Sequence, residues 1–212
     1  MVYRKQGAAP DVPARPRGRP RDEQIDEHIL DAALALLDET EYSRVTLDAV
    51  AARAGVHRPA IYRRWPTKQH LIIDTFARGL GLAPAPDTGD TRRDLVEGVS
   101  TLSHAFSGPF GRALGALVAD LARDRELLAL FRRRVFDVRR ASMVKALERG
   151  IQRGDIDPHV DIELVLDLLA APLYYRVLFQ HGPATKKVAQ ALVDHVLRSI
   201  RVSPASSRAP LR

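Results

Sequence analysis

Residues 45–68, VTLDAVAARAGVHRPAIYRRWPTK, decide the fold, because they have the pattern of two short helices joined by a tight turn. Thr46 can cap the first helix, since its hydroxyl can accept hydrogen bonds from backbone N–H groups that have no intrahelical partner. Apolar residues three and four positions apart give that helix one buried face. Gly55 ends it where a positive φ is often needed. A second helix follows over residues 58–64 with Ile61 on its inner side, so the sequence predicts a helix-turn-helix.

This stretch resembles the DNA-binding domain of TetR-family transcriptional regulators, whose recognition helices end in sequences like AIYRRWPTK. The resemblance covers residues 22–80. It implies an all-α protein with an N-terminal three-helix helix-turn-helix domain and a C-terminal helical domain for ligand binding and dimerisation. Family members often carry a hydroxyl residue where this chain has Ala60, which departs from that pattern. The alternative is an alanine-rich helical hairpin with charged outer faces, and the cap, glycine and isoleucine in register argue against it.

The outer side of the second helix is expected to contact DNA, because a basic helix face suits the major groove. Asparagine is absent from the chain, and arginine outnumbers lysine 28 to 5. Since arginine can donate two hydrogen bonds to guanine O6 and N7, we expect Arg58 and Arg64 to recognise guanines. Pro59 and Ala60 are expected to make close apolar contacts, for example with a thymine methyl group. The residues expected to hold phosphates are Thr46, Tyr62, Arg63 and Lys68.

The positive charge of the chain is concentrated around this motif. The formal net charge is +7. Residues 1–21 contribute +5 and residues 53–78 another +5, which suits the neutralisation of phosphates. Residues 1–21 contain four prolines and are expected to form a flexible basic arm. We expect Arg17 and Arg19 of this arm to lie in a minor groove, and an unbound solvated tail is the alternative.

Several classes of function are disfavoured by what the chain lacks. It contains no cysteine, which excludes disulfides, zinc–thiolate sites and thiol nucleophiles and suits a reducing cytoplasm. No apolar run approaches the about 20 residues of a membrane helix, and the N-terminus lacks the apolar region of a secretory signal. Common catalytic and nucleotide-binding motifs are absent, so we expect no enzyme and no cofactor. Turn formers and a helix cap, rather than metal ligands, are the interpretation of Asp155, Asp157, His159 and Asp161.

The rest of the chain is expected to be helical, in two domains and about nine helices. Residues 79–89, GLGLAPAPDTG, form a glycine- and proline-rich break that predicts the domain boundary. We therefore expect a helix-turn-helix domain over 22–80, a helical domain over 90–202 and a disordered tail over 203–212. Pro172 is expected to kink its helix without ending it. The predicted helices are 22–39, 47–54, 58–64, 67–80, 91–106, 109–122, 124–153, 161–180 and 185–202.

An apolar ligand pocket is expected between the three middle helices of the second domain. Four of the six phenylalanines of the chain lie in this region, which suits an apolar or aromatic ligand. Aromatic residues at helical spacing are often plain core, so this interpretation competes with the pocket. His104 is a candidate hydrogen-bonding group for the ligand. The expected pocket residues are Leu102, Phe106, Phe110, Leu114, Leu117, Phe131 and Val135.

The penultimate helix carries more apolar surface than one core stripe needs, which predicts a homodimer interface. Together with the last helix it can pair with a second copy as a four-helix bundle. The two recognition helices would then lie about 34 Å apart and match a palindromic operator. A wholly buried central helix in a monomer is the alternative. The expected interface residues are Leu164, Leu168, Tyr174, Leu178, Val188, Leu192 and Val196.

These patterns predict a ligand-responsive transcriptional regulator, namely a repressor that binds double-stranded DNA as a homodimer and is released by a small apolar ligand. We call the two DNA-binding domains of the dimer its heads. A ligand that binds more tightly to the dimer when the heads have another spacing would lower DNA affinity by the difference between its affinities for the two states. Two alternatives stay open. One is an architectural or constitutive DNA-binding regulator without a ligand, and the other is a small helical enzyme with an incidental helix-turn-helix.

Overall fold

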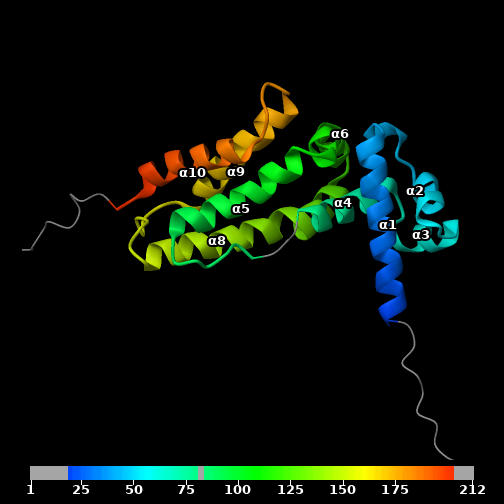
Figure 1. Ribbon diagram of the computed structural model, residues 1–212, viewed down its shortest axis with the longest axis horizontal. Helices are drawn as coiled ribbons and strands as arrows, with labels where there is room; N and C mark the ends of the chain where they lie inside the picture. The colour runs from blue at the N-terminus through cyan, green and yellow to red at the C-terminus, as the bar shows by residue number, and fades with distance from the viewer. Residues whose placement is uncertain (1–18, 81–83, 203–212) are drawn as a thin grey trace, which may run out of the picture.

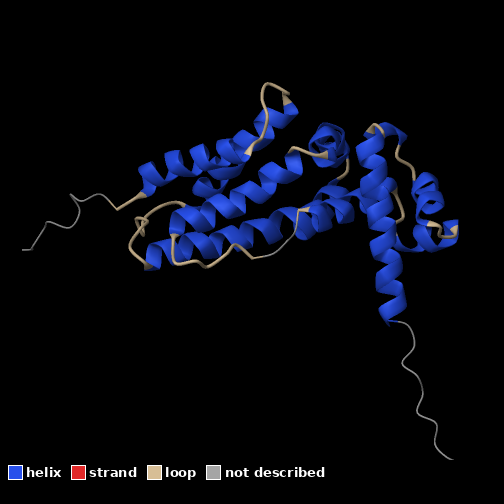
Figure 2. Cartoon of the chain, in the orientation of Figure 1, coloured by secondary structure: helices blue, strands red, loops and turns tan. Residues whose placement is uncertain are grey.

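The computed structural model describes residues 19–80 and 84–202, and every regular element in those ranges is helical (Figure 2). The π-helical segment Arg132–Phe136 joins the helices Arg125–Phe131 and Asp137–Gln152 without a break, so the predicted helix 124–153 is one continuous run. The expectation of an all-α fold with about nine helices is confirmed. The elements are α1 (Arg19–Glu39), η1 (Tyr42–Arg44), α2 (Leu47–Ala54), α3 (Arg58–Arg64), α4 (Lys68–Gly79), α5 (Thr91–Phe106), α6 (Pro109–Arg123), α7 (Arg125–Phe131), η2 (Arg132–Phe136), α8 (Asp137–Gln152), α9 (Ile162–Leu178) and α10 (Lys186–Ile200).

Helix α1 begins earlier than the sequence predicted. The expected start was Asp22, whereas the helix begins at Arg19. Pro20 falls in the first turn, where a missing backbone N–H breaks no intrahelical hydrogen bond. Residues 19–21 therefore belong to α1 and not to the predicted arm. Arg17 and the rest of residues 1–18 lie outside the described residues, as do residues 203–212 and the side chain of Arg19.

The first domain packs α1 against the helix-turn-helix formed by α2 and α3. Its core contains Ile29, Ile61 and Leu71, each fully buried. Thr46 caps α2 by accepting a hydrogen bond from a backbone N–H at 3.1 Å. Gly55 ends α2 with a φ of +66°. The predicted cap and turn are confirmed, and together they fix the sharp change of direction that presents α3.

Helix α4 links this domain to an elongated bundle in which α5 and α8 to α10 pack together (Figure 1). Helices α6 and α7 lie at the end of the bundle nearest the first domain. Helix α9 continues through Pro172, as expected, and begins at the cap of Asp161, which accepts from a backbone N–H at 3.2 Å. None of the helices in the described ranges is both long and apolar enough to span a bilayer.

The two domains are joined by apolar and ionic contacts of α6. The Phe110 ring lies so close to Gly79 that an added Cβ would be 2.1 Å from it, and its centroid is 4.3 Å from that of Phe76. Glycine is needed at position 79 for this close approach. At the same joint, Arg112 pairs with Asp38 of α1 at 2.7 Å. These contacts connect α6 of the bundle to α4 and α1 of the first domain.

Candidate nucleic-acid interface and ligand cavity

The outer side of α3 carries exposed side chains that are oriented by one carboxylate of α2. The Arg58 Nε donates to Asp48 at 2.6 Å, and the Tyr62 hydroxyl donates to the same oxygen at 3.3 Å. The Arg58 side chain is 67% exposed. An ion pair this exposed is worth about 0–1 kcal/mol, so Arg58 can leave Asp48 for a better partner.

Other predicted DNA contacts also lie at the surface. Arg63 is exposed and forms no hydrogen bond or ion pair with the described part of the chain. Pro59 is exposed in the first turn of α3, and Ala60 beside it is half-buried. The Thr46 oxygen accepts from the backbone, which leaves the hydroxyl hydrogen available to a phosphate. We call the following residues the α3 face: Thr46, Arg58, Pro59, Ala60, Tyr62 and Arg63.

Arg64 is placed differently from the prediction. Its side chain is 14% exposed, pairs with Asp26 of α1 and donates to the Ala60 carbonyl at 3.2 Å. A guanidinium held between α1 and α3 cannot reach a base edge without giving up that ion pair. We therefore correct the assignment of Arg64 from base reading to fastening α3 onto α1. The inward orientation of Arg64 could have been predicted from the helical period, because residues three positions apart share a helix face and Arg64 follows the buried Ile61 by three positions.

Lys68 lies at the domain joint rather than on the α3 face. Its Nζ donates to the Tyr42 carbonyl at 3.0 Å and lies 4.3 Å from the centroid of the Tyr42 ring. Burial lowers the pKa of Lys68, and the charge of Asp120 partly offsets this effect. Asp120 of α6 accepts from the Tyr42 hydroxyl at 2.7 Å and from the Gln69 amide at 2.9 Å. Lys68 therefore connects α4 to η1, and its predicted phosphate contact would compete with these interactions.

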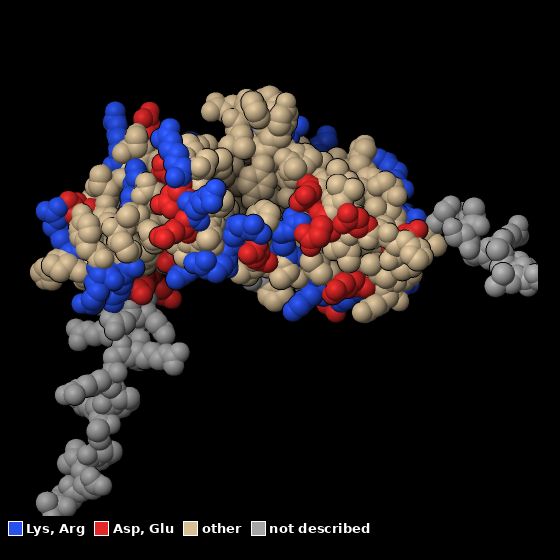
Figure 3. Space-filling model, turned by 180° about the vertical axis from the view of Figure 1, so that it is seen from behind, with Lys and Arg blue, Asp and Glu red and all other residues tan. Residues whose placement is uncertain are grey.

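Charge is divided unevenly over the face of the molecule seen in Figure 3. Lysine and arginine side chains gather over the end that the helix-turn-helix domain forms, with carboxylates interspersed. The upper part of the second domain shows a stretch without charged side chains. The basic end suits a polyanion, and an uncharged stretch of surface suits contact with another protein surface.

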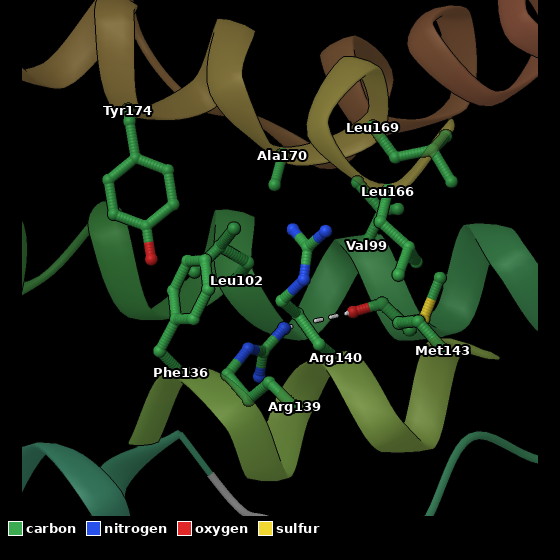
Figure 4. Close-up of a pocket in the computed structure, with 11 residues that line it drawn as sticks. Val99, Leu102, Phe136, Arg139, Arg140, Met143, Leu166, Leu169, Ala170 and Tyr174 are labelled. Carbon is green, nitrogen blue, oxygen red and sulfur yellow. Dashed lines mark hydrogen bonds between the residues drawn. The ribbon is translucent and has the colours of Figure 1, made fainter. Parts of the chain in front are cut away.

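The second domain contains a half-open cavity of about 60 Å³ between α5, η2, α8 and α9 (Figure 4). Of the predicted pocket residues, Leu102 lines the cavity. The whole wall consists of Gly98, Val99, Leu102, Phe136, Arg139, Arg140, Met143, Leu166, Leu169, Ala170 and Tyr174.

The other predicted pocket residues lie outside this wall. Phe106 packs edge-on against Tyr174, with ring centroids 4.8 Å apart. Phe110 lies at the domain joint, and Phe131 is half-buried in α7. His104 is exposed and lines a recess between α1 and the α5–α6 turn. The residues that are plain core are Leu114, Leu117 and Val135.

Sequence reasoning missed the part that α8 and α9 play in the cavity. Arg139 and Arg140 belong to a charged stretch that reads as a solvated helix surface. Tyr174 was assigned to the dimer interface, whereas its side chain extends from α9 toward the cavity (Figure 4). Helix α9 packs against α5 and α8, and this packing brings the residues together. No local pattern in the sequence predicts it.

One side of α9 is apolar and exposed. Leu164, Leu168, Tyr175 and Phe179 are between 46% and 68% exposed. Spacings of four, seven and four residues put them along one stripe of the helix. The opposite stripe of α9 is buried in the bundle. We call the exposed residues the α9 face: Leu164, Leu168, Tyr175, Leu178 and Phe179.

Two of the predicted interface residues do not belong to this exposed surface. Tyr174 lines the cavity, and Val196 is buried among the helices of its own chain. Both are therefore removed from the expected interface. Val188 and Leu192 of α10 are half-buried. Sequence periodicity alone cannot separate the two apolar stripes of a helix that is apolar on all sides.

A chain of hydrogen bonds joins the cavity wall to the end of α3. Arg134 lies in η2, two residues before Phe136 of the wall. Its Nη1 donates to Asp74 of α4 at 2.8 Å, and the Trp65 Nε1 donates to the other oxygen of that carboxylate at 2.8 Å. Trp65 is the residue that ends α3. Two hydrogen bonds to one carboxylate therefore connect η2 to the residue that ends α3.

A basic helix-turn-helix joined to a helical domain with a cavity between its helices defines a DNA-binding regulator with a domain suited to ligands. Residues 29–75 match the family model described as bacterial regulatory proteins, tetR family, and residues 85–196 match the tetracyclin repressor-like C-terminal domain. The chain therefore belongs to the TetR family of transcriptional regulators, and the sequence resemblance is confirmed.

Relatives of nearly the same length support this assignment. The HTH-type transcriptional regulator YdeS of Bacillus subtilis is 33% identical over 191 residues, 90% of this chain and 96% of the relative. The DNA-binding transcriptional repressor TetR of Mycobacteroides abscessus is 29% identical over 180 residues, 84% of this chain and 94% of the relative. The crystal structure of the TetR family transcription regulator SCO0332 superposes with a TM-score of 0.71 at 30% identity, covering 85% of this chain and 100% of that one.

Proposed function

We propose that this protein is a repressor that binds a palindromic operator as a homodimer in the cytoplasm and releases it when a small ligand enters the cavity. The observation that carries the proposal is the chain of hydrogen bonds from Arg134 through Asp74 to Trp65, because it ties the cavity wall to the recognition helix. The name of the Mycobacteroides abscessus relative favours repression over activation.

In the proposed complex, the α3 face binds the operator. Arg58 contacts base edges, Pro59 and Ala60 make apolar contacts, and Thr46, Tyr62 and Arg63 hold phosphates. A bidentate contact of arginine with guanine discriminates between bases by about 1–3 kcal/mol. This exceeds the about 0–1 kcal/mol of an exposed ion pair, so we expect Arg58 to leave Asp48 when a guanine is within reach.

The α9 face supplies the dimer interface in this proposal. A stripe of apolar side chains on an exposed helix is costly to keep in water, and a second copy can cover it across a two-fold axis. Val188 and Leu192 of α10 border the same interface. Two heads held in this way would contact half-sites about 34–36 Å apart on one side of the duplex.

Ligand release follows from the size and position of the cavity. A molecule that fills the cavity contacts α5, α8 and α9 together, and one larger than the cavity would displace these helices relative to η2. Because η2 carries both Phe136 of the wall and Arg134 of the connection to α4, that movement would change the separation of the two heads. A hundredfold loss of operator affinity requires only about 2.7 kcal/mol of differential ligand binding.

Selection of bound genomic fragments by the purified full chain tests the proposal. The expected result is a set of fragments that share an inverted repeat with half-sites about one helical turn apart. Repeating the selection with pooled cellular small molecules should deplete those fragments. A protein that stays monomeric in dilute solution and retains fragments without a shared sequence would contradict the proposal.

A constitutive regulator is the second candidate, and the small cavity favours it. Ligand sites commonly measure about 300–1,000 Å³, several times the 60 Å³ of this cavity. Under this reading the inverted repeat would still be selected, but no small molecule would change operator affinity or raise the melting temperature. Thermal shift measurements on the same pools separate the two candidates.

A further inference from the structure

We propose that the cavity takes a small monoanion with an apolar body, a carboxylate or a phenolate, whose charge pairs with Arg139. This inference rests on the proposed ligand-dependent function and specifies the class of ligand. It replaces the purely apolar ligand expected from the phenylalanine content with one that carries a single negative charge.

Two adjacent arginines line the cavity, and only one has its charge neutralised. Arg140 donates to Asp167 at 2.6 Å and also pairs with Glu163, so its charge is matched by carboxylates of α9. Arg139 donates to the Gly98 carbonyl at 3.3 Å, drawn as a dashed line in Figure 4, and to the Thr101 hydroxyl at 3.1 Å. Both of these acceptors are neutral. Within residues 19–80 and 84–202, Arg139 forms no ion pair.

Tyr174 offers a second donor to the same space. Its side chain extends from α9 with the hydroxyl directed toward the side of the cavity that holds Phe136 and Arg139 (Figure 4). The hydroxyl forms no hydrogen bond within the described ranges. Burial raises the pKa of Tyr174, so the phenol remains protonated and able to donate. Burial lowers the pKa of Arg139, which means that its charge is poorly solvated where it lies. An anion between the two groups would satisfy both.

The remaining wall selects the rest of the ligand. Val99, Leu102, Leu166 and Leu169 are apolar and buried, so they favour an alkyl or aryl body. Met143 separates the cavity from an adjoining recess of about 200 Å³, and Arg139 lines both spaces. A methionine has three rotatable side-chain bonds, so its rotation can merge the two. The merged space suits a single-ring or medium-chain acid rather than a large drug-sized molecule.

Matched pairs of probes test the charge directly. Titration calorimetry on the full chain at neutral pH would compare octanoate with octanamide, and 4-ethylbenzoate with 4-ethylbenzamide. Each pair has the same apolar body and differs in charge. The expected result is about 10- to 100-fold tighter binding of the acids, the range of a charge-assisted hydrogen-bonded pair. Arg139→Gln should abolish that preference while leaving amide affinity within about twofold. Arg139→Lys should keep part of it.

Leu166→Ala is the control, because it removes wall contacts from acid and amide alike and should weaken both equally. Thermal unfolding of every variant reports whether it folds. The inference is overturned if the amides bind as tightly as the acids, if Arg139→Gln weakens both members of a pair equally, or if neither class binds folded protein.

Operator binding in the same samples distinguishes a failure of this inference from a failure of the proposed ligand-dependent function. If the amides bind as tightly as the acids and cause the protein to release the operator, the anionic ligand is excluded but ligand-dependent release is supported. If the acids bind tightly and the protein keeps the operator, the anion site is supported but ligand-dependent release is contradicted.

Discussion

Two arginines of α3 that look alike in the sequence have different surroundings, and alanine variants should separate them. Arg58→Ala removes an exposed side chain and is expected to reduce discrimination among operator variants by about 1–3 kcal/mol. Arg64→Ala removes the pair with Asp26 and is expected to lower stability by about 1–3 kcal/mol with discrimination unchanged. Titrations of operator variants and thermal unfolding measure the two effects. Lost discrimination in Arg64→Ala at an unchanged melting temperature would contradict the inward placement of Arg64.

A second residue-scale prediction concerns Asp94, a fully buried carboxylate at the start of α5. It accepts from the Thr88 amide at 3.0 Å and from the Thr88 hydroxyl at 2.6 Å, and it lies within 3.9 Å of Arg149 and Arg153. Asp94→Ala leaves these donors without their acceptor and should reduce the free energy of unfolding by about 1–3 kcal/mol.

Asp87 is the matched control for Asp94, because it contacts the same two arginines at 3.3 and 3.7 Å but is 62% exposed. Its alanine variant should change stability by less than about 1 kcal/mol. Urea unfolding of both variants gives the comparison. Equal losses would mean that burial of Asp94 adds nothing to its contribution.

At the scale of elements, the connection between η2 and α4 should determine how much of the ligand signal reaches DNA. Arg134→Ala removes the contact with Asp74 but leaves the hydrogen bond of Trp65 in place. We expect ligand affinity to change little and ligand-induced release of the operator to shrink by about 0.5–2 kcal/mol, or about 2- to 30-fold.

The control for this variant is Arg133→Ala in the same turn, since Arg133 is exposed and forms no ion pair or hydrogen bond with any residue the structure describes. Operator titrations with and without ligand measure the release for both variants. If Arg133→Ala reduces the release as much as Arg134→Ala, the effect comes from lost charge near DNA and not from the connection to α4.

Helix positions could be predicted because their signals are local. The caps at Thr46 and Asp161 and the turn at Gly55 act within a few residues, so the pattern contains them. The π-helical turns of η2 could not be predicted in this way, because that segment packs against α4 and its path depends on the tertiary contact. Hydrogen-bond partners of side chains could not be predicted either. Tyr42 and Asp120, for example, are 78 residues apart in the sequence, and no periodicity relates them.

At the scale of the whole molecule, the division into a DNA-binding and a second helical domain follows from composition, whereas the cavity does not. Its wall combines residues of α5, α8 and α9 that are tens of residues apart, and its polar groups come from stretches that read as solvated surface or as interface. Only their joint packing makes Arg139 and Tyr174 neighbours of one space. The ligand class is therefore a structural inference, while the DNA-binding class already follows from the sequence.

The last prediction concerns assembly, because two recognition helices can match a palindrome only when the chain pairs with a second copy. Leu168→Glu places a charge in the α9 face, where burial in an interface would leave it unpaired, so it should give monomers in sedimentation velocity and much weaker operator binding. Leu128→Glu is the control: Leu128 is 41% exposed and Leu168 is 46% exposed, but Leu128 lies on α7. It should leave the dimer intact. Dimers of unchanged stability in Leu168→Glu would exclude the α9 face as the interface, and the spacing of the heads would then need another contact.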